Sequence, residues 1–154
     1  MDAEQNLDSE IEILAIAPSM EKIERLEDLI LQLPQAELPV THEFLDCLYA
    51  RSMLIPAGVV LTGATHKYDN FLFVRYGDIT ILTEDGCKRF KAGDMISSKA
   101  GIKRAMFSHE DTLITTMHNN PTNETDEDVL WNIFTNQSNN LLETEKPIIL
   151  EAIL

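Results

Sequence analysis

The imidazole and thiol side chains of this chain, which could bind a metal or move a proton, are few and widely spaced. Beside its many carboxylates, the chain has four histidines and two cysteines: His42, His66, His109, His118, Cys47 and Cys87. Two cysteines are too few for a disulfide framework or a cysteine metal site, so we expect both to be reduced. An imidazole can serve as a general base, a metal ligand or a packing group. Histidines scattered in this way are usually surface or packing residues.

The spacing around His66 and Arg104 resembles the cupin superfamily. The first cupin motif reads glycine, five residues, His-x-His, three or four residues, Glu, six residues, glycine. The second reads glycine, five residues, Pro-x-Gly, two residues, His, three residues, Asn. Every interval is kept here, although most residue types differ. The matching positions are Gly58, Ala64, His66, Asn70 and Gly77 in the first motif, and Gly93, Lys99, Gly101, Arg104 and Ser108 in the second.

The resemblance covers residues 51–118, which is under half of the chain. A looser similarity links the runs IPAGVVLTGATHK, LTEDG and SHEDT to small cupin-like proteins of tailed phages. It implies a viral origin and supplies no activity.

The resemblance places four residues where cupins hold a metal with three histidines and a glutamate: Ala64, His66, Asn70 and Arg104. Alanine has no donor atom, an amide oxygen is a weak ligand, and a guanidinium stays cationic and repels a metal. We therefore expect no metal and no cofactor at this position. A rebuilt site that uses His109 and His118 is an alternative, but His109 lies in an expected turn outside the barrel, and the facing of His118 stays open.

His66 and Arg104 remain as candidate binding residues, together with Asn70. Strand alternation puts His66 on the inward face beside Ala64. It is either a core histidine hydrogen-bonded to a neighbour such as Asn70, or a polar anchor or general base in a pocket.

An inward Arg104 needs compensation for its charge. An internal salt bridge, for instance to Asp69 or Glu84, would supply it. A carboxylate or phosphate ligand matched to the guanidinium fork would do the same.

The elements that must position these residues change in character along the chain. From 51 to 118, short apolar runs alternate with glycine turns, and Asp85-Gly86 is a strong hairpin signal, which predicts a β-sandwich or barrel. Residues 1–50 are expected to form a helical extension, with apolar positions of helical spacing between Ser19 and Leu33 and a stop at Pro34.

Residues 119–154 are expected to form a helix and an apolar tail. Thr125 is the expected N-cap of a helix that begins at Asp126. The tail KPIILEAIL is expected to pack on the barrel or on a neighbouring subunit, because free exposure would promote aggregation.

Charge and hydropathy narrow the function classes. The net charge of −14 disfavours binding to nucleic acids and to anionic membranes. The start of the chain lacks the basic and apolar regions of a secretory signal, and no apolar run approaches the ~20 residues of a membrane span. These features predict a cytoplasmic location, either host cytoplasm or virion.

Together these features predict a mainly β protein with a single cupin-type jelly-roll barrel and flanking helices at both termini. The expected function is non-catalytic: a self-associating cupin module that acts as a structural or binding protein. Its expected partners are further copies, bound through the helical extensions and the tail, and a virion or other protein. The alternatives are a cupin enzyme (a metal-dependent dioxygenase or isomerase, or a metal-free sugar epimerase) and a binder of a small anionic ligand through Arg104.

Overall fold

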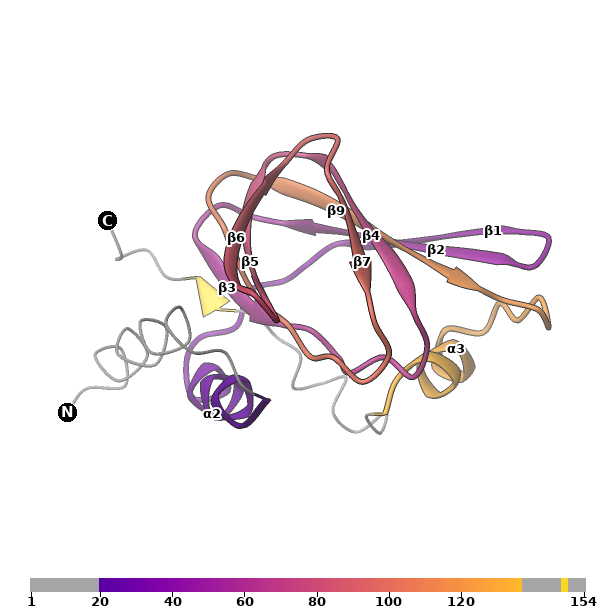
Figure 1. Cartoon of the computed structure of the whole chain (residues 1–154), viewed down its shortest axis with the longest axis horizontal. Helices are drawn as coiled ribbons and strands as arrows, with labels where there is room; N and C mark the ends of the chain where they lie inside the picture. The colour runs from indigo at the N-terminus through magenta and orange to yellow at the C-terminus, as the bar shows by residue number, and fades with distance from the viewer. Residues whose placement is uncertain (1–19, 137–147, 150–154) are drawn as a thin grey trace.

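The computed structural model describes residues 20–136 and 148–149. The expected Ser19 cap and most of the apolar tail lie outside the described residues. Two five-stranded sheets face each other, with helices at both ends (Figure 1). The first sheet has the order β1-β2-β9-β4-β7 and the second the order β10-β3-β8-β5-β6. This arrangement confirms the predicted mainly β jelly-roll fold with terminal helices.

The strands of the first sheet are β1 (Val40–Leu45), β2 (Leu48–Ile55), β4 (Asn70–Tyr76), β7 (Met95–Ser98) and β9 (Thr112–Asn119). Those of the second are β3 (Val59–Thr62), β5 (Asp78–Thr83), β6 (Gly86–Lys91), β8 (Ala105–Ser108) and β10 (Ile148–Ile149). The strand pairs of the described residues are all antiparallel, and alternate side chains of each strand face the space between the sheets. The closed end of the barrel is filled by aliphatic side chains of both sheets, chiefly Ile55, Val59, Val74, Ile79 and Ile81.

The hairpin between β5 and β6 forms where the sequence predicts it, but one residue earlier. Thr83 pairs with Gly86, so Glu84 and Asp85 make the two-residue loop. Gly86 has a φ of 102°, a conformation that residues with a Cβ rarely adopt. The glycine is therefore needed for the turn, although it lies just after the loop.

Gly77 has a stricter steric requirement. Its φ is 95°, and a Cβ at this position would lie 2.4 Å from Thr112 Oγ1 and 2.6 Å from Asp111 O. The strand end at β4 passes too close to the start of β9 for any side chain. This contact gives a physical reason for the last glycine of the first motif.

Helix α2 (Met20–Ile30) lies against the second sheet. Its buried face is Ile23, Leu26 and Ile30, which packs with Val60, Leu82 and Ala105 on the outer side of that sheet. The helix thus matches the apolar spacing seen in the sequence, and it ends at Ile30, a few residues before Pro34.

Helix α3 (Glu127–Phe134) closes the other end of the barrel, below β1 and β2 in Figure 1. Its N-cap is Asp126, whose side chain accepts hydrogen bonds from the backbone of Asp128 and Val129. The prediction of Thr125 as the cap was wrong by one residue. An ionised carboxylate at the N-cap also interacts well with the helix dipole.

The expected helical extension to residue 50 is corrected by β1 and the start of β2. The run Val40–Leu45 alternates half-buried and exposed side chains and pairs with Leu48–Met53 as a hairpin. Its turn contains no glycine. Instead Cys47 takes a φ of 59°, and its backbone N–H donates to Asn123 Oδ1 at 2.7 Å. A turn held by a distant side chain leaves no local signal in the sequence.

Part of the C-terminal tail pairs with the second sheet. Ile148 and Ile149 pair with Val60 and Val59, so this part of the tail adds a strand to the chain's own barrel. Within the described ranges, no helix has the length and apolar character needed to cross a membrane.

Candidate functional site

A cavity of about 750 Å³ opens between the first sheet, the segment after β3 and helix α3. Inward-facing residues of β2, β4 and β9 line it, as do residues near the ends of β3 and β7. The three candidates from the sequence, His66, Asn70 and Arg104, all contribute to its wall. The structure therefore brings them to one place.

Arg104 lies in the segment between β7 and β8, and only 7% of the residue is exposed. Its Nη1 lies 3.7 Å from Glu84 Oε2, and its Nη2 donates to the carbonyl of Ser97 at 3.4 Å. Nε and Nη1 have no hydrogen-bond partner among the described residues. A buried guanidinium is thus only partly compensated, by a long contact to a half-exposed carboxylate.

The two acids proposed as partners of Arg104 have different positions. Glu84 is in contact with it. Asp69 instead accepts hydrogen bonds from Lys99 Nζ at 3.0 Å and from the backbone of Ala100 at 2.9 Å. These contacts hold the pKa of the Asp69 carboxyl below its usual value. Asp69 therefore stabilises the loop before β8 and does not compensate the arginine.

His66 and His118 lie together in the cavity wall, with ring centroids 5.3 Å apart. Burial, aided by the charge of Arg51, lowers the pKa of His66 to about 4. Burial, with His66 and Arg51 adding to the effect, lowers the pKa of His118 to about 3. Both imidazoles are consequently neutral at pH 7.

The hydrogen bond expected between His66 and Asn70 is not formed. Asn70 Nδ2 donates to the carbonyl of Tyr68 at 3.4 Å. His118 lines the cavity, so its facing, which the sequence left open, is inward, and its Nε2 lies 3.1 Å from Thr116 Oγ1. His109 lies on the turn before β9, as expected, where its Nε2 contacts Thr80 Oγ1 at 2.7 Å.

An aromatic cluster lies in the cavity wall beside α3. The ring of Tyr49 stacks at less than 6 Å on four other rings: His42, Phe44, His118 and Phe134. Its hydroxyl lies 2.8 Å from His42 Nδ1, and His42 Nε2 lies 3.4 Å from Glu127 Oε1. Burial raises the pKa of Tyr49 to about 12. Tyr49 is therefore a neutral packing residue that joins β2 to α3.

Sequence reasoning missed Arg51, the second cation of the cavity. It lies on β2, two residues from Tyr49 and from Met53, and these three share the inward face. Its charge contributes to the lowered pKa values of both cavity histidines. Period-two alternation in 48–55 would have found it, had this segment been read as one strand.

The metal that the cupin resemblance implies does not fit the residues present. Ala64 and His66 line the cavity with Asn70 and Arg104, so the four motif positions offer one imidazole, one amide and a fixed positive charge. In the described part of the chain, no group of three or more His, Cys, Asp or Glu residues could hold a metal ion. We derive no metal chemistry from this site.

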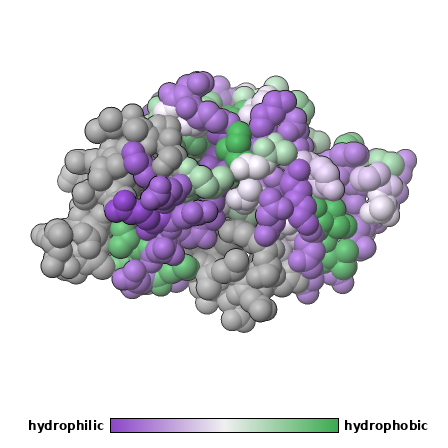
Figure 2. Space-filling view, turned by 60° about the horizontal axis from the view of Figure 1, so that its bottom comes forward, coloured by the Kyte–Doolittle hydropathy of each residue, from purple (hydrophilic) through white to green (hydrophobic). Residues whose placement is uncertain are grey.

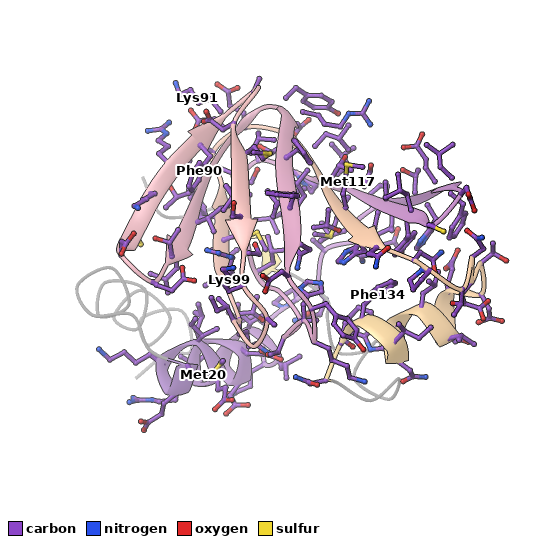
Figure 3. The ribbon with its side chains drawn as sticks, turned by 45° about the vertical axis from the view of Figure 1, so that its right-hand side comes forward. Met20, Phe90, Lys91, Lys99, Met117 and Phe134 are labelled. Atoms are coloured by element: carbon purple, nitrogen blue, oxygen red, sulfur yellow. The ribbon has the colours of Figure 1, made fainter. Side chains whose placement is uncertain are left out.

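Polar side chains cover much of the described surface in Figure 2, and apolar side chains gather at its right, the end of the molecule where α3 and the β1–β2 hairpin lie. Figure 3 shows Phe134 of α3 beneath the sheet that carries β9, so this helix closes the cavity from below. Trp131 also lines the cavity, and its indole Nε1 is buried without a hydrogen-bond partner in the described residues.

Comparison with known proteins finds no matching family model and no matching curated protein. Solved structures do match. A cupin-2 domain protein of Shewanella frigidimarina has 14% identity over 56% of this chain and 82% of its own, with a TM-score of 0.45. KdgF from a Halomonas species has 14% identity over 58% and 89%, with a TM-score of 0.49.

A conserved protein of unknown function from Streptococcus pyogenes has 17% identity over 58% of this chain and 79% of its own, with a TM-score of 0.46. At these identities the likeness concerns the fold alone. By its strand topology the chain is a two-sheet jelly-roll barrel, and solved cupin structures are what it is similar to.

Proposed function

We propose that this protein is a non-catalytic cupin-type binding module that holds a small organic anion inside its barrel. The observation that supports it most is Arg104, a buried guanidinium in the cavity wall with two nitrogens that lack hydrogen-bond partners in the described chain. Leaving a buried charge unsatisfied is costly. A carboxylate or phosphate that enters the cavity would offset this cost by a charge-assisted hydrogen bond.

The charge distribution of the cavity supports the same class of ligand. The chain carries a net charge of −14, yet the inward faces of its barrel present Arg51 and Arg104 with two neutral imidazoles. The acids that line the cavity, Glu27, Glu37, Glu127 and Asp128, lie on α2, on α3 or before β1 and not on the inward faces of the barrel strands. Two of them have partners, since Glu27 pairs with Lys103 and Glu127 contacts His42. The inner wall is therefore more favourable to an anion than the surface is.

The enzymatic alternatives fit the geometry less well. A general base works best with a pKa near the working pH, and the pKa of about 4 makes His66 a weak base at pH 7. The Lys, Tyr and Asp side chains next to His66, which a metal-free epimerase would use, also do not line the cavity. Tyr68 and Asp69 are exposed, and Lys67 Nζ donates to the carbonyl of Asn132 on α3 at 2.6 Å.

Self-association, a phage origin and a virion partner stay predictions from the sequence. A binding role does not depend on any of them. It depends on whether an anion enters the barrel.

Isothermal titration with phosphate, citrate, glucose 6-phosphate and adenosine monophosphate tests the proposal, with glucose and adenosine as uncharged counterparts. We expect at least one anion to bind while its uncharged counterpart does not. Arg51→Gln and Arg104→Gln should each weaken binding about 10- to 100-fold, because a hydrogen bond to a charged group contributes about 1.5–3 kcal/mol.

Arg25→Gln is the matched control, since Arg25 is an exposed arginine of α2 outside the cavity lining. It should leave the affinity unchanged. Equal binding of glucose and glucose 6-phosphate, or affinities insensitive to Arg51 and Arg104, would contradict an anion site in the barrel.

A further inference from the structure

The outer face of the first sheet is unusually apolar for a surface that no other described element covers. An antiparallel sheet with one solvated face normally alternates apolar residues inside with polar residues outside. Here large apolar side chains point outward on all five strands, with Leu45 73% and Met95 55% exposed. The outward apolar residues include Leu45, Leu48, Phe71, Phe73, Met95 and Met117.

The register joins these side chains into one patch, which we call the outer apolar face. Phe71 on β4 pairs with Met117 on β9, and Met117 pairs with Ala50 on β2. Phe73 pairs with Met95 on β7. Residues directly opposite on one face have Cβ atoms about 4.5–5.5 Å apart, so their side chains are in contact range across the sheet.

Two polar residues within this patch are satisfied by each other. Ser52 and Thr115 face each other on β2 and β9, and their hydroxyls are 2.8 Å apart. Both residues are buried although they lie on the outer side. The neighbouring apolar side chains already exclude solvent around them, as they do at the centre of a protein interface.

Two charges remain on the patch, and they are of opposite sign. Glu43 on β1 and Arg75 on β4 are exposed and line a groove of about 730 Å³ together with Phe73 and Met117. Neither forms an ion pair with another residue of the described ranges. They lie on different strands, with β2 and β9 between β1 and β4 in the sheet.

We infer that the outer apolar face binds a second copy of this chain. When two copies meet through a flat face, a two-fold axis in the plane of contact relates them. For any two points of the face, such an axis can be placed so that the first point of one copy lies opposite the second point of the other. An axis that exchanges Glu43 with Arg75 places each acid opposite the arginine of the other copy, and the apolar residues between them meet their equivalents. A surface with one acid and one base in an apolar field is therefore self-complementary, as an isologous interface requires.

The area of the outer apolar face is of the same order as the area that each partner buries in a stable interface. Five strands at about 4.8 Å spacing and about 20 Å long cover roughly 480 Å² before the relief of the side chains is counted. Stable interfaces bury about 800 Å² per partner. This contact leaves the cavity free, because Met117 and Phe134 lie on opposite sides of the sheet (Figure 3).

The inference is independent of the proposed ligand, and sedimentation velocity of the full chain tests it. We expect a dimer of twice 17.4 kDa in the native protein. Met117→Glu should weaken the dimer at least about 100-fold, because it buries an unpaired charge at the centre of the contact. Met117 is exposed, so the variant should keep its fold, which circular dichroism checks.

A charge exchange makes the test specific to a two-fold contact. Glu43→Arg alone and Arg75→Glu alone should each weaken the dimer, because like charges then face each other. The double variant Glu43→Arg/Arg75→Glu should restore dimerisation to within about threefold of the native value. Glu24→Arg, on the exposed side of α2, is the control for charge reversal and should have no effect.

Three results would overturn the inference. The first is a monomer at all concentrations up to the solubility limit. The second is a dimer that Met117→Glu leaves unchanged. The third is a dimer insensitive to the outer apolar face but lost on deletion of 137–154, which would assign the contact to the C-terminal tail.

Discussion

Replacing His118 by phenylalanine should make the fold less sensitive to acid. The pKa of His118 is lowered from 6.5 to about 3, chiefly by burial. A histidine whose folded-state pKa lies below its unfolded value binds protons more readily in the unfolded chain. The stability that it contributes is present above pH 6.5 and is lost as the pH falls from 6.5 towards 3.

The size of the effect follows from these two values. Between pH 7 and pH 5, protonation of this one imidazole in the unfolded chain lowers the free energy of unfolding by about 2 kcal/mol. The figure changes little if the folded pKa is one unit higher, since the folded imidazole is still mostly neutral at pH 5. His66, with its pKa lowered to about 4, acts in the same direction. A domain of marginal stability should therefore lose a large part of its free energy of unfolding between pH 7 and pH 5.

Phenylalanine is a suitable replacement because of the surroundings of the ring. His118 stacks on Tyr49 and lies 4.8 Å from the ring centroid of Phe134. Within the described ranges its one side-chain hydrogen bond is to Thr116, whose hydroxyl also donates to the carbonyl of Arg51 at 3.4 Å. The substitution therefore removes the titrating group and leaves Thr116 with a partner.

Urea unfolding at pH 7 and pH 5 measures the effect. The native protein should lose about 2 kcal/mol more than His118→Phe between these pH values. His109→Gln is the control, because His109 lies on an outer turn and should change the pH dependence less. Parallel losses in the native protein and in His118→Phe would refute the reasoning, as would an imidazole signal of His118 that titrates near pH 6.5 in NMR spectra.

Three further predictions concern the turns, the helix cap and the cavity. Gly77→Ala should lower the unfolding midpoint in urea clearly more than Gly86→Ala, because both have positive φ but only at Gly77 would a Cβ meet other atoms within 4 Å; equal effects would contradict the steric explanation. Asp126→Ala should destabilise the protein by about 1 kcal/mol through loss of the N-cap of α3, and an unchanged thermal midpoint would show that the cap contributes nothing. Glu84→Gln should strengthen binding of an anion severalfold in calorimetry, because it removes the carboxylate that competes for Arg104, and weaker binding would count against the site.

The sequence was sufficient for the barrel because its glycines and strands carry local signals. Gly77 and Gly86 both adopt positive φ, and the segments between the glycine turns alternate as strands do. The hairpin of β1 and β2 was missed for the opposite reason. Its turn is built on Cys47 and held by Asn123, a contact between residues 76 positions apart that no local pattern reveals.

The candidate site could be located only in part. Motif spacing brought His66, Asn70 and Arg104 to one wall of the cavity. Arg51 was missed because β2 crosses the boundary at residue 50 between the expected helical extension and the expected barrel, so that Leu48–Ile55 was not interpreted as one strand. His118 was also undecided, because a residue at the end of a strand has no neighbour beyond it to establish alternation.

Trp131 gives this protein a built-in optical reporter. It is the single tryptophan of the chain, it lines the cavity, and its indole N–H has no partner in the described residues. Indole emission depends on local polarity and on hydrogen bonding to the excited ring. Filling of the barrel, or release of α3 from it, should therefore shift the fluorescence spectrum of the unlabelled protein, so that occupancy can be followed in real time without a dye.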